Sequence, residues 1–118
     1  MALERPIEQY ESVATWAHGL REQWGGDPLA EEPEKLAGLT AFCEFDGRNP
    51  DELLAFCFLR RKKTGVRFAS VKRREAMAEQ LRTFRTASGL SGTEGRRLTS
   101  NLLSFFIHNG IQMHTGML

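Results

Sequence analysis

The chain has 118 residues, 41% of them hydrophobic and 26% charged, which is the composition of one soluble globular domain. It contains no signal peptide and no apolar run of the roughly 20 residues that a membrane helix needs, so we expect a cytoplasmic protein without a membrane partner. Cys43 and Cys57 form no Cys-x-x-Cys motif and lie in apolar stretches. This arrangement favours buried free thiols over a disulfide.

The net charge of +1 conceals a strong division of charge along the chain. Residues 1–59 contain 4 Lys and Arg against 12 Asp and Glu, a balance of −8, whereas residues 60–97 contain 12 Lys and Arg against 3 Glu, a balance of +9. Residues 98–118 contain none of these four residue types, so the sum is −8 + 9 = +1. Such a basic segment favours a polyanion partner, usually nucleic acid. On charge alone, a solvated basic surface or pairing with the acidic half explains it equally well.

Hydrophobic residues recur with helical spacing along the chain, and no segment shows the alternation of a strand. The first two predicted helices cover residues 7–24 and 33–46. The third covers residues 50–61, with Asn49 as its N-cap. Because this third segment is almost wholly apolar from Leu53 to Leu59, we expect it at the centre of the core.

Two further helices are predicted in the second half of the chain. Ser70 caps a fourth helix over residues 70–87, whose buried face carries Met77, Ala78, Leu81 and Phe84. The fifth, over residues 92–109, begins with a capping box at Ser91 and ends at Gly110 in a left-handed conformation. Together the segments predict an all-α fold, a compact bundle of four to five short helices.

Three clusters of polar and cationic residues are candidate contacts for a phosphate backbone, at the end of the third helix and at the starts of the fourth and fifth. Their members are, in chain order, Arg60, Arg61, Lys62, Lys63 and Arg67; Lys72, Arg73 and Arg74; and Ser91, Thr93, Arg96 and Arg97. Cations at a helix start oppose the helix dipole at a cost of about 0.3–1 kcal/mol each, whereas a phosphate there is stabilised by the backbone amides and by these cations. In the first cluster, cations at a helix end are favourable without any ligand, so a purely structural role stays open.

The sequence contains no motif for catalysis or metal binding. His18, His108 and His114 lack cysteines or paired carboxylates at metal-ligand spacing, and no Gly-rich phosphate loop or nucleophile elbow occurs. The aromatic residues have the spacing of core residues rather than of a base-stacking surface: Phe42, Phe45, Phe56, Phe58, Phe84, Phe105 and Phe106. We therefore expect no metal, no cofactor and no enzymatic activity in this chain.

Two stretches, FCEFDGRNPDELL (residues 42–54) and GLSGTEGRRLTSNLLSFFIHNGI (residues 89–111), together resemble the N-terminal core-binding (SAM-like) domain of tyrosine recombinases, the phage-integrase type of site-specific recombinase. The shared features are an aromatic helix end before a Pro-Asp-Glu-Leu helix start, and a last helix that opens with Gly-Leu-Ser and closes with Ser-Phe-Phe…Asn-Gly-Ile. Four positions depart from the pattern. Gly92 replaces a common proline, Gly95 lies inside the first turn of the last helix and weakens it, and Leu103 and Ile107 replace polar or basic residues.

The resemblance implies a domain that clamps duplex DNA for DNA recombination or integration. The strands would be exchanged by a C-terminal catalytic domain of the same protein, which this chain lacks. Tyr10 is the only tyrosine and has no arginine box in the family's order, so we expect no DNA cleavage by this chain. The resemblance also implies that the second and fourth helices lie toward the major groove, which adds Lys35 to the DNA-contacting candidates.

Leu103 and Ile107 are predicted to lie on the outer face of the last helix, opposite its core-facing residues. Exposed apolar pairs mark contact surfaces, and in the resembled family this helix faces a neighbouring protomer. We therefore expect the pair to form a protomer contact on DNA. Two other functions stay open at this stage: a helical protein-interaction module that docks an acidic partner, and a stand-alone helical DNA-binding regulator.

Overall fold

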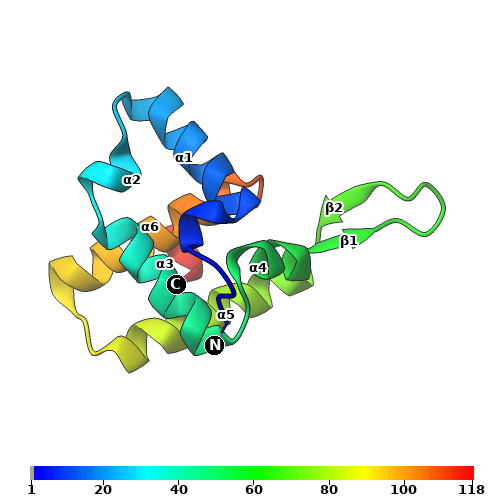
Figure 1. Cartoon of the computed structure of the whole chain (residues 1–118). Coiled ribbons are helices and arrows are strands. Elements are labelled where there is room, and N and C mark those ends of the chain that lie inside the picture. Colours follow the sequence, from blue (N-terminus) through cyan, green and yellow to red (C-terminus); the bar gives the residue numbers. More distant parts are fainter. Residues whose placement is uncertain (1) are drawn as a thin grey trace.

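The computed structural model describes residues 2–118, which fold into a helical bundle from which one β-hairpin projects (Figure 1). In chain order the elements are a 3-10 helix Ile7–Gln9, α1 Glu11–Trp24, α2 Pro28–Glu31, α3 Glu34–Asp46, α4 Pro50–Cys57, β1 Phe58–Arg60, β2 Arg67–Ala69, α5 Val71–Ser88, α6 Gly92–His108 and a 3-10 helix Thr115–Met117. The prediction of an all-α bundle is confirmed, with the hairpin as its one exception among the described residues.

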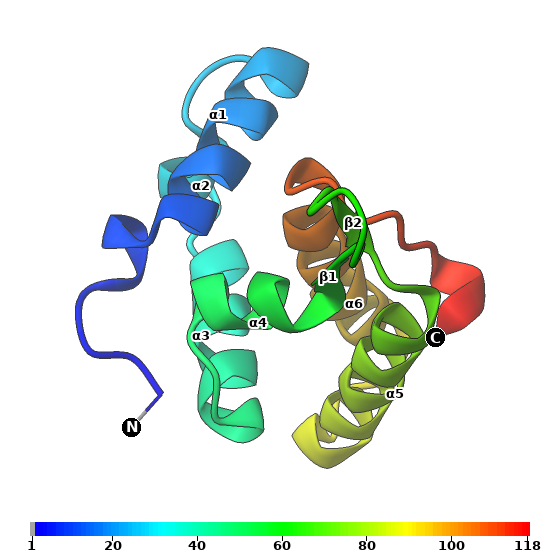
Figure 2. The same cartoon turned by 90° about the vertical axis from the view of Figure 1, so that its right-hand side faces the viewer.

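Helix α6 forms the centre of the core. It packs against α1, α3 and α5, and Figure 2 shows it alongside α5. Phe105 and Phe106 are fully buried, and the ring of Trp16 from α1 meets Phe105 edge-on with 5.6 Å between ring centroids. The Trp16 Nε1 donates to Ser104 Oγ at 3.0 Å, so the indole is buried with its polar atom satisfied.

The start of α1 is held by residues from two other helices. The Asp51 Oδ1, at the start of α4, accepts from the Ser12 backbone N–H at 3.0 Å. The Asn109 side chain, at the end of α6, donates to the carbonyls of Ser12 at 3.1 Å and Phe105 at 2.8 Å. Gly110 follows with φ +86°, as predicted, and turns the chain back onto the bundle. The Asn-Gly pair therefore ends α6 and also joins it to α1.

The predicted third helix differs most from the structure. It ends at Cys57 rather than at residue 61, and the chain continues as β1, which pairs with β2 in an antiparallel hairpin. The expectation of no strands is therefore wrong. Aromatic residues favour strands, and Gly65 with φ +71° turns the loop, but strands of three residues are too short to show alternation. Leu53 is buried at the core, whereas Leu59 is 39% exposed on the hairpin.

Two smaller differences concern the first third of the chain. The predicted helix over residues 7–24 is interrupted at Tyr10, whose extended backbone separates the short 3-10 helix from α1. The loop that follows α1 contains the short helix α2. Neither break disturbs the core, because Tyr10 itself is 1% exposed.

Two predictions of side-chain exposure are wrong, one for a residue of α6 and one for a residue of α3. Leu103 is 3% exposed, so the predicted outer apolar pair is wrong for Leu103, whereas Ile107 is 49% exposed. The reason is that α6 is covered by three helices, so its buried arc is wider than one face. Phe45, predicted as core, is 40% exposed and packs its ring against Phe84 at 5.3 Å.

The helix caps agree with the sequence at two of three predicted positions. The Asn49 side chain accepts from the Glu52 N–H at 2.8 Å and Glu52 returns the bond at 2.9 Å, which completes a capping box. Ser70 Oγ accepts from the Arg73 N–H at 3.2 Å. The capping box predicted at Ser91 is wrong, because its hydroxyl makes no cap bond and only its backbone carbonyl accepts from the first turn of α6.

This contrast predicts different effects of two matched substitutions. Asn49→Ala should lower the free energy of unfolding by about 1 kcal/mol, since it removes a side-chain cap. Ser91→Ala should change it by only a few tenths of a kcal/mol, because no cap bond is lost. Urea denaturation followed by circular dichroism measures both. Equal destabilisation by the two substitutions would contradict the assigned caps.

Candidate nucleic-acid interface

The structure brings two of the three predicted cationic clusters to one end of the molecule. Strand β2 passes through Ser70 directly into α5, so the hairpin and the first turn of α5 adjoin (Figure 1). We name this region the basic end; its residues are Arg60, Arg61, Lys62, Lys63, Arg67, Lys72, Arg73 and Arg74. All are exposed except Arg74, which is half-buried.

Arginine–aromatic contacts fix the two strands of the hairpin against each other. The Arg67 guanidinium lies over the Phe58 ring, with its carbon 3.7 Å from the ring centroid, and Arg61 lies over Phe68 at 5.0 Å. Such contacts position a guanidinium without neutralising its charge. The hairpin therefore presents its cations in a defined arrangement, still available to an anion.

Arg73 and Arg74 have structural contacts as well. Arg73 lies over the Phe56 ring at 4.7 Å and donates to the Phe56 carbonyl at 3.4 Å. The Arg74 Nη1 donates to the Gln112 carbonyl at 3.2 Å and so joins α5 to the C-terminal segment, while its buried Nε has no partner. Lys72, between these arginines and the hairpin, is exposed and takes part in no ion pair of the described chain.

The acidic half of the chain does not neutralise the basic segment. Across residues 2–118, the ion pairs are His18–Glu22, Lys35–Glu32 and Arg48–Asp46, and each lies within the first half. None of the 12 Lys and Arg of residues 60–97 is therefore paired with an acidic side chain. The described residues therefore show no direct ion pair between the basic segment and the acidic half.

The third predicted cluster lies at a different end of the molecule. Helix α5 has 18 residues and so is about 27 Å long, and α6 begins only after it has ended. Arg96 and Arg97 are both exposed there, and Arg96 donates to Thr93 Oγ1 at 3.2 Å. Ser91 is exposed at the same helix start. The structure thus does not bring this cluster together with the basic end.

Lys35 is turned into the bundle rather than toward solvent. Its Nζ donates to Asn101 Oδ1 of α6 at 2.8 Å, lies 3.7 Å from Glu32 Oε2, and leaves the side chain 15% exposed. The sequence held no signal for this contact, because Asn101 is 66 residues away along the chain. Lys35 therefore has an internal role that competes with the predicted contact to DNA.

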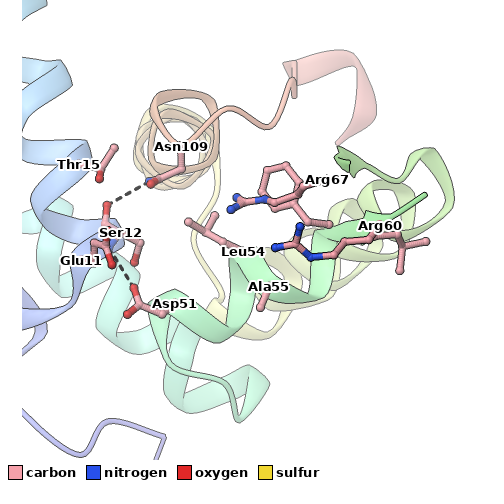
Figure 3. A pocket seen from close by; sticks show the side chains of 11 residues that line it. Glu11, Ser12, Thr15, Asp51, Leu54, Ala55, Arg60, Arg67 and Asn109 are labelled. Atoms are coloured by element: carbon pink, nitrogen blue, oxygen red, sulfur yellow. Dashed lines mark hydrogen bonds between the residues drawn. The ribbon is translucent and has the colours of Figure 1, made fainter. Parts of the chain in front are cut away.

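An open groove of about 680 Å³ separates the hairpin from the helices, and sequence reasoning did not foresee it. Arg60 and Arg67 line it on the hairpin side, whereas Glu11 and Asp51 line it on the helix side (Figure 3). The carboxylates disfavour an anion deep in the groove. A polyanion is therefore expected at the outer part of the hairpin and at the start of α5.

Cys43 and Cys57 are buried free thiols. Burial raises the pKa of the Cys43 thiol to about 12 and that of Cys57 to about 11, so both stay protonated at neutral pH. Within residues 2–118, no three His, Cys, Asp or Glu side chains are grouped to hold a metal ion. No helix in that range is long and apolar enough to cross a membrane.

The two stretches that resemble recombinases fall on the junction of α3 with α4 and on α6, the elements that organise the core. Comparison of the chain with family models, curated proteins and solved structures finds no match. The surface is therefore interpreted from its geometry and charge.

Proposed function

We propose that this chain binds duplex DNA through the basic end. The observation that carries the proposal is the absence, within residues 2–118, of any acidic partner for the cations of residues 60–97. A folded chain that keeps such a concentration of charge unpaired repels itself, and a polyanion relieves that repulsion. The same ligand also removes the unfavourable interaction of Lys72 and Arg73 with the positive end of α5.

Duplex DNA fits this surface better than an acidic protein does. The duplex carries about one negative charge per 1.7 Å of its length, a density that peptides with flexible carboxylates do not reach. The planar guanidinium of Arg61 and the exposed ammonium group of Lys72 suit phosphate oxygens. The hairpin also holds its arginines in place before binding, which lowers the entropy lost on association.

The resemblance on residues 42–54 and 89–111 supports a more specific role within this proposal. The chain would act as the core-binding domain of a tyrosine recombinase, positioning DNA for strand exchange by a separate catalytic domain. Its contribution is then made by cations that position the duplex, without a chemical step in this chain. A gene that continues past Leu118 into an Arg…His-x-x-Arg…Tyr domain supports this role, and a stop codon there favours a stand-alone regulator.

Competition between two polyanions tests the choice of partner. A fluorescently labelled duplex should bind the chain at low salt, and poly-glutamate should displace it only at about tenfold or higher excess of charge. Fluorescence anisotropy measures both steps. Displacement by poly-glutamate at equal charge would show that the basic end recognises negative charge of any kind, as expected for a module that docks an acidic protein.

A further inference from the structure

We propose that the hairpin enters the major groove tip first, so that Lys62, Lys63 and Thr64 reach the base edges while Arg60 and Arg67 contact the phosphates at the groove's rim. This inference rests on the proposed binding of duplex DNA and adds to it the groove and the depth of insertion. It is carried by the shape, the register and the internal bonding of residues 58–69.

The first observation is that the hairpin projects away from the helical bundle. Residues 59–67 are all exposed, and the loop between β1 and β2 lies farther from the helices than any other part of the hairpin (Figure 1). Phe58 at the base of the hairpin packs against the core, whereas residues 59–67 contribute no buried side chain to it. The outer part of the hairpin is therefore free to contact a ligand.

The second observation is that the hairpin is ordered by its own contacts. A two-stranded hairpin alone is only marginally stable in water. Here the Arg60 Nη1 donates to the Gly65 carbonyl at 2.9 Å, and the Arg61 backbone N–H donates to the Val66 carbonyl at 2.9 Å. With the Arg67–Phe58 contact at its base, these bonds stiffen the ribbon up to its turn.

The third observation is the register of the two strands. Arg60 and Arg67 are directly opposed across the ribbon. Like charges at opposed positions destabilise a strand pair by several tenths of a kcal/mol unless something compensates them. Both side chains lie on the same face of the ribbon, where they line the groove beside the hairpin, and phosphate oxygens at the outer edge of that groove would compensate their charges.

The dimensions decide which groove is entered and how far. The major groove is about 12 Å wide and admits a two-stranded ribbon, whereas the minor groove, about 6 Å wide, does not. Its depth of about 8.5 Å corresponds to between two and three residues of extended chain at about 3.3 Å each. Arg60 precedes Lys63 by three residues and Arg67 follows Thr64 by three. Residues 62–64 form the turn, and the Gly65 N–H donates to the Arg61 carbonyl at 2.8 Å, so these steps are shorter than extended chain. When the tip touches the base edges, both arginines are therefore at the rim of the groove or just inside it.

Two duplexes of identical sequence test the inference. In one of them every cytosine carries a glucosylated hydroxymethyl group, which fills the major groove and leaves the phosphates unchanged. We expect the wild-type chain to bind the unmodified duplex about tenfold or more tightly than the glucosylated one. Saturating the minor groove of the unmodified duplex with netropsin should leave the affinity unchanged.

A shortened chain serves as the matched variant. Replacing residues 61–66 by Asn-Gly joins Arg60 to Arg67 through a two-residue turn and removes the tip. Its overall affinity should fall, and its ratio of affinities for the two duplexes should approach one. Circular dichroism verifies its helices, and the wild-type comparison stands whether or not this variant folds.

The results that overturn the inference are distinct from those that overturn DNA binding itself. Equal binding of both duplexes by the wild-type chain, or displacement by netropsin, would exclude insertion of the hairpin while duplex binding still stood. Continued tenfold discrimination by the shortened chain would assign the groove to another element and also exclude it. Failure of the wild-type chain to bind either duplex at low salt would refute the proposed function, and the inference with it.

Discussion

Replacing Lys62, Lys63 and Lys72 together by alanine is expected to weaken duplex binding by about a hundredfold at 0.1 M salt. Each lysine held against the duplex, at a phosphate or within the negatively charged groove, displaces roughly one condensed counterion, so the loss of three lysines acts multiplicatively. These lysines are exposed and take part in no ion pair of residues 2–118, so the change leaves the fold intact. Fluorescence anisotropy with a labelled duplex measures the affinity.

A second triple variant separates position from net charge. Arg21→Ala, Arg96→Ala and Arg97→Ala together also change the net charge from +1 to −2, but these residues lie outside the basic end. We expect this variant to lose at most about tenfold in affinity, by the weaker long-range attraction of screened charges. If both triple variants lost affinity equally, binding would depend on overall charge and the basic end would not be the interface.

Trp16→Ala should lower the free energy of unfolding by about 3–5 kcal/mol. The substitution leaves a cavity beside Phe105 and removes the donor to the Ser104 hydroxyl. A chain of this size is stabilised by about 5–15 kcal/mol in total, so the loss is a large share of it. Urea denaturation monitored by circular dichroism measures the change.

The second tryptophan of the chain is the natural control. Trp24, the last residue of α1, is 73% exposed, and Trp24→Ala should change the stability by no more than about 0.5 kcal/mol. Comparable destabilisation by the two substitutions would mean that the packing of α1 on α6 is not the main support of the bundle.

The helices of this fold could be predicted because their signals are local. The signals are apolar residues at helical spacing, Asn49 before a proline, and glycines after α5 and α6. Each signal can be recognised from a few neighbouring positions of the sequence. The burial of Leu103 could not be predicted in the same way. The burial of Leu103 depends on how many helices pack against α6. The spacing of apolar residues within α6 does not reveal how many helices that is. The same limit applies to Lys35, whose partner Asn101 comes from a distant helix.

The candidate site was predicted by composition and then reshaped by the fold. The charge division indicated residues 60–97, but the sequence presented Arg60–Lys63 as the end of a helix. In the structure these residues belong to a hairpin, which places the cations away from the bundle and pairs Arg60 with Arg67. Its strands are too short for alternation to reveal, and the groove beside it requires α1 and α4 to be in place. The third cluster shared the chemistry of the other two but not their location.

The salt dependence of duplex affinity tests the central claim most directly. With six or more cations of the basic end held against the duplex, a plot of log affinity against log salt concentration should have a slope of about −5 for the wild-type chain. The Lys62, Lys63 and Lys72 variant should reduce this slope by about three. A wild-type slope close to zero, or an unchanged slope in the variant, would contradict a DNA interface at the basic end.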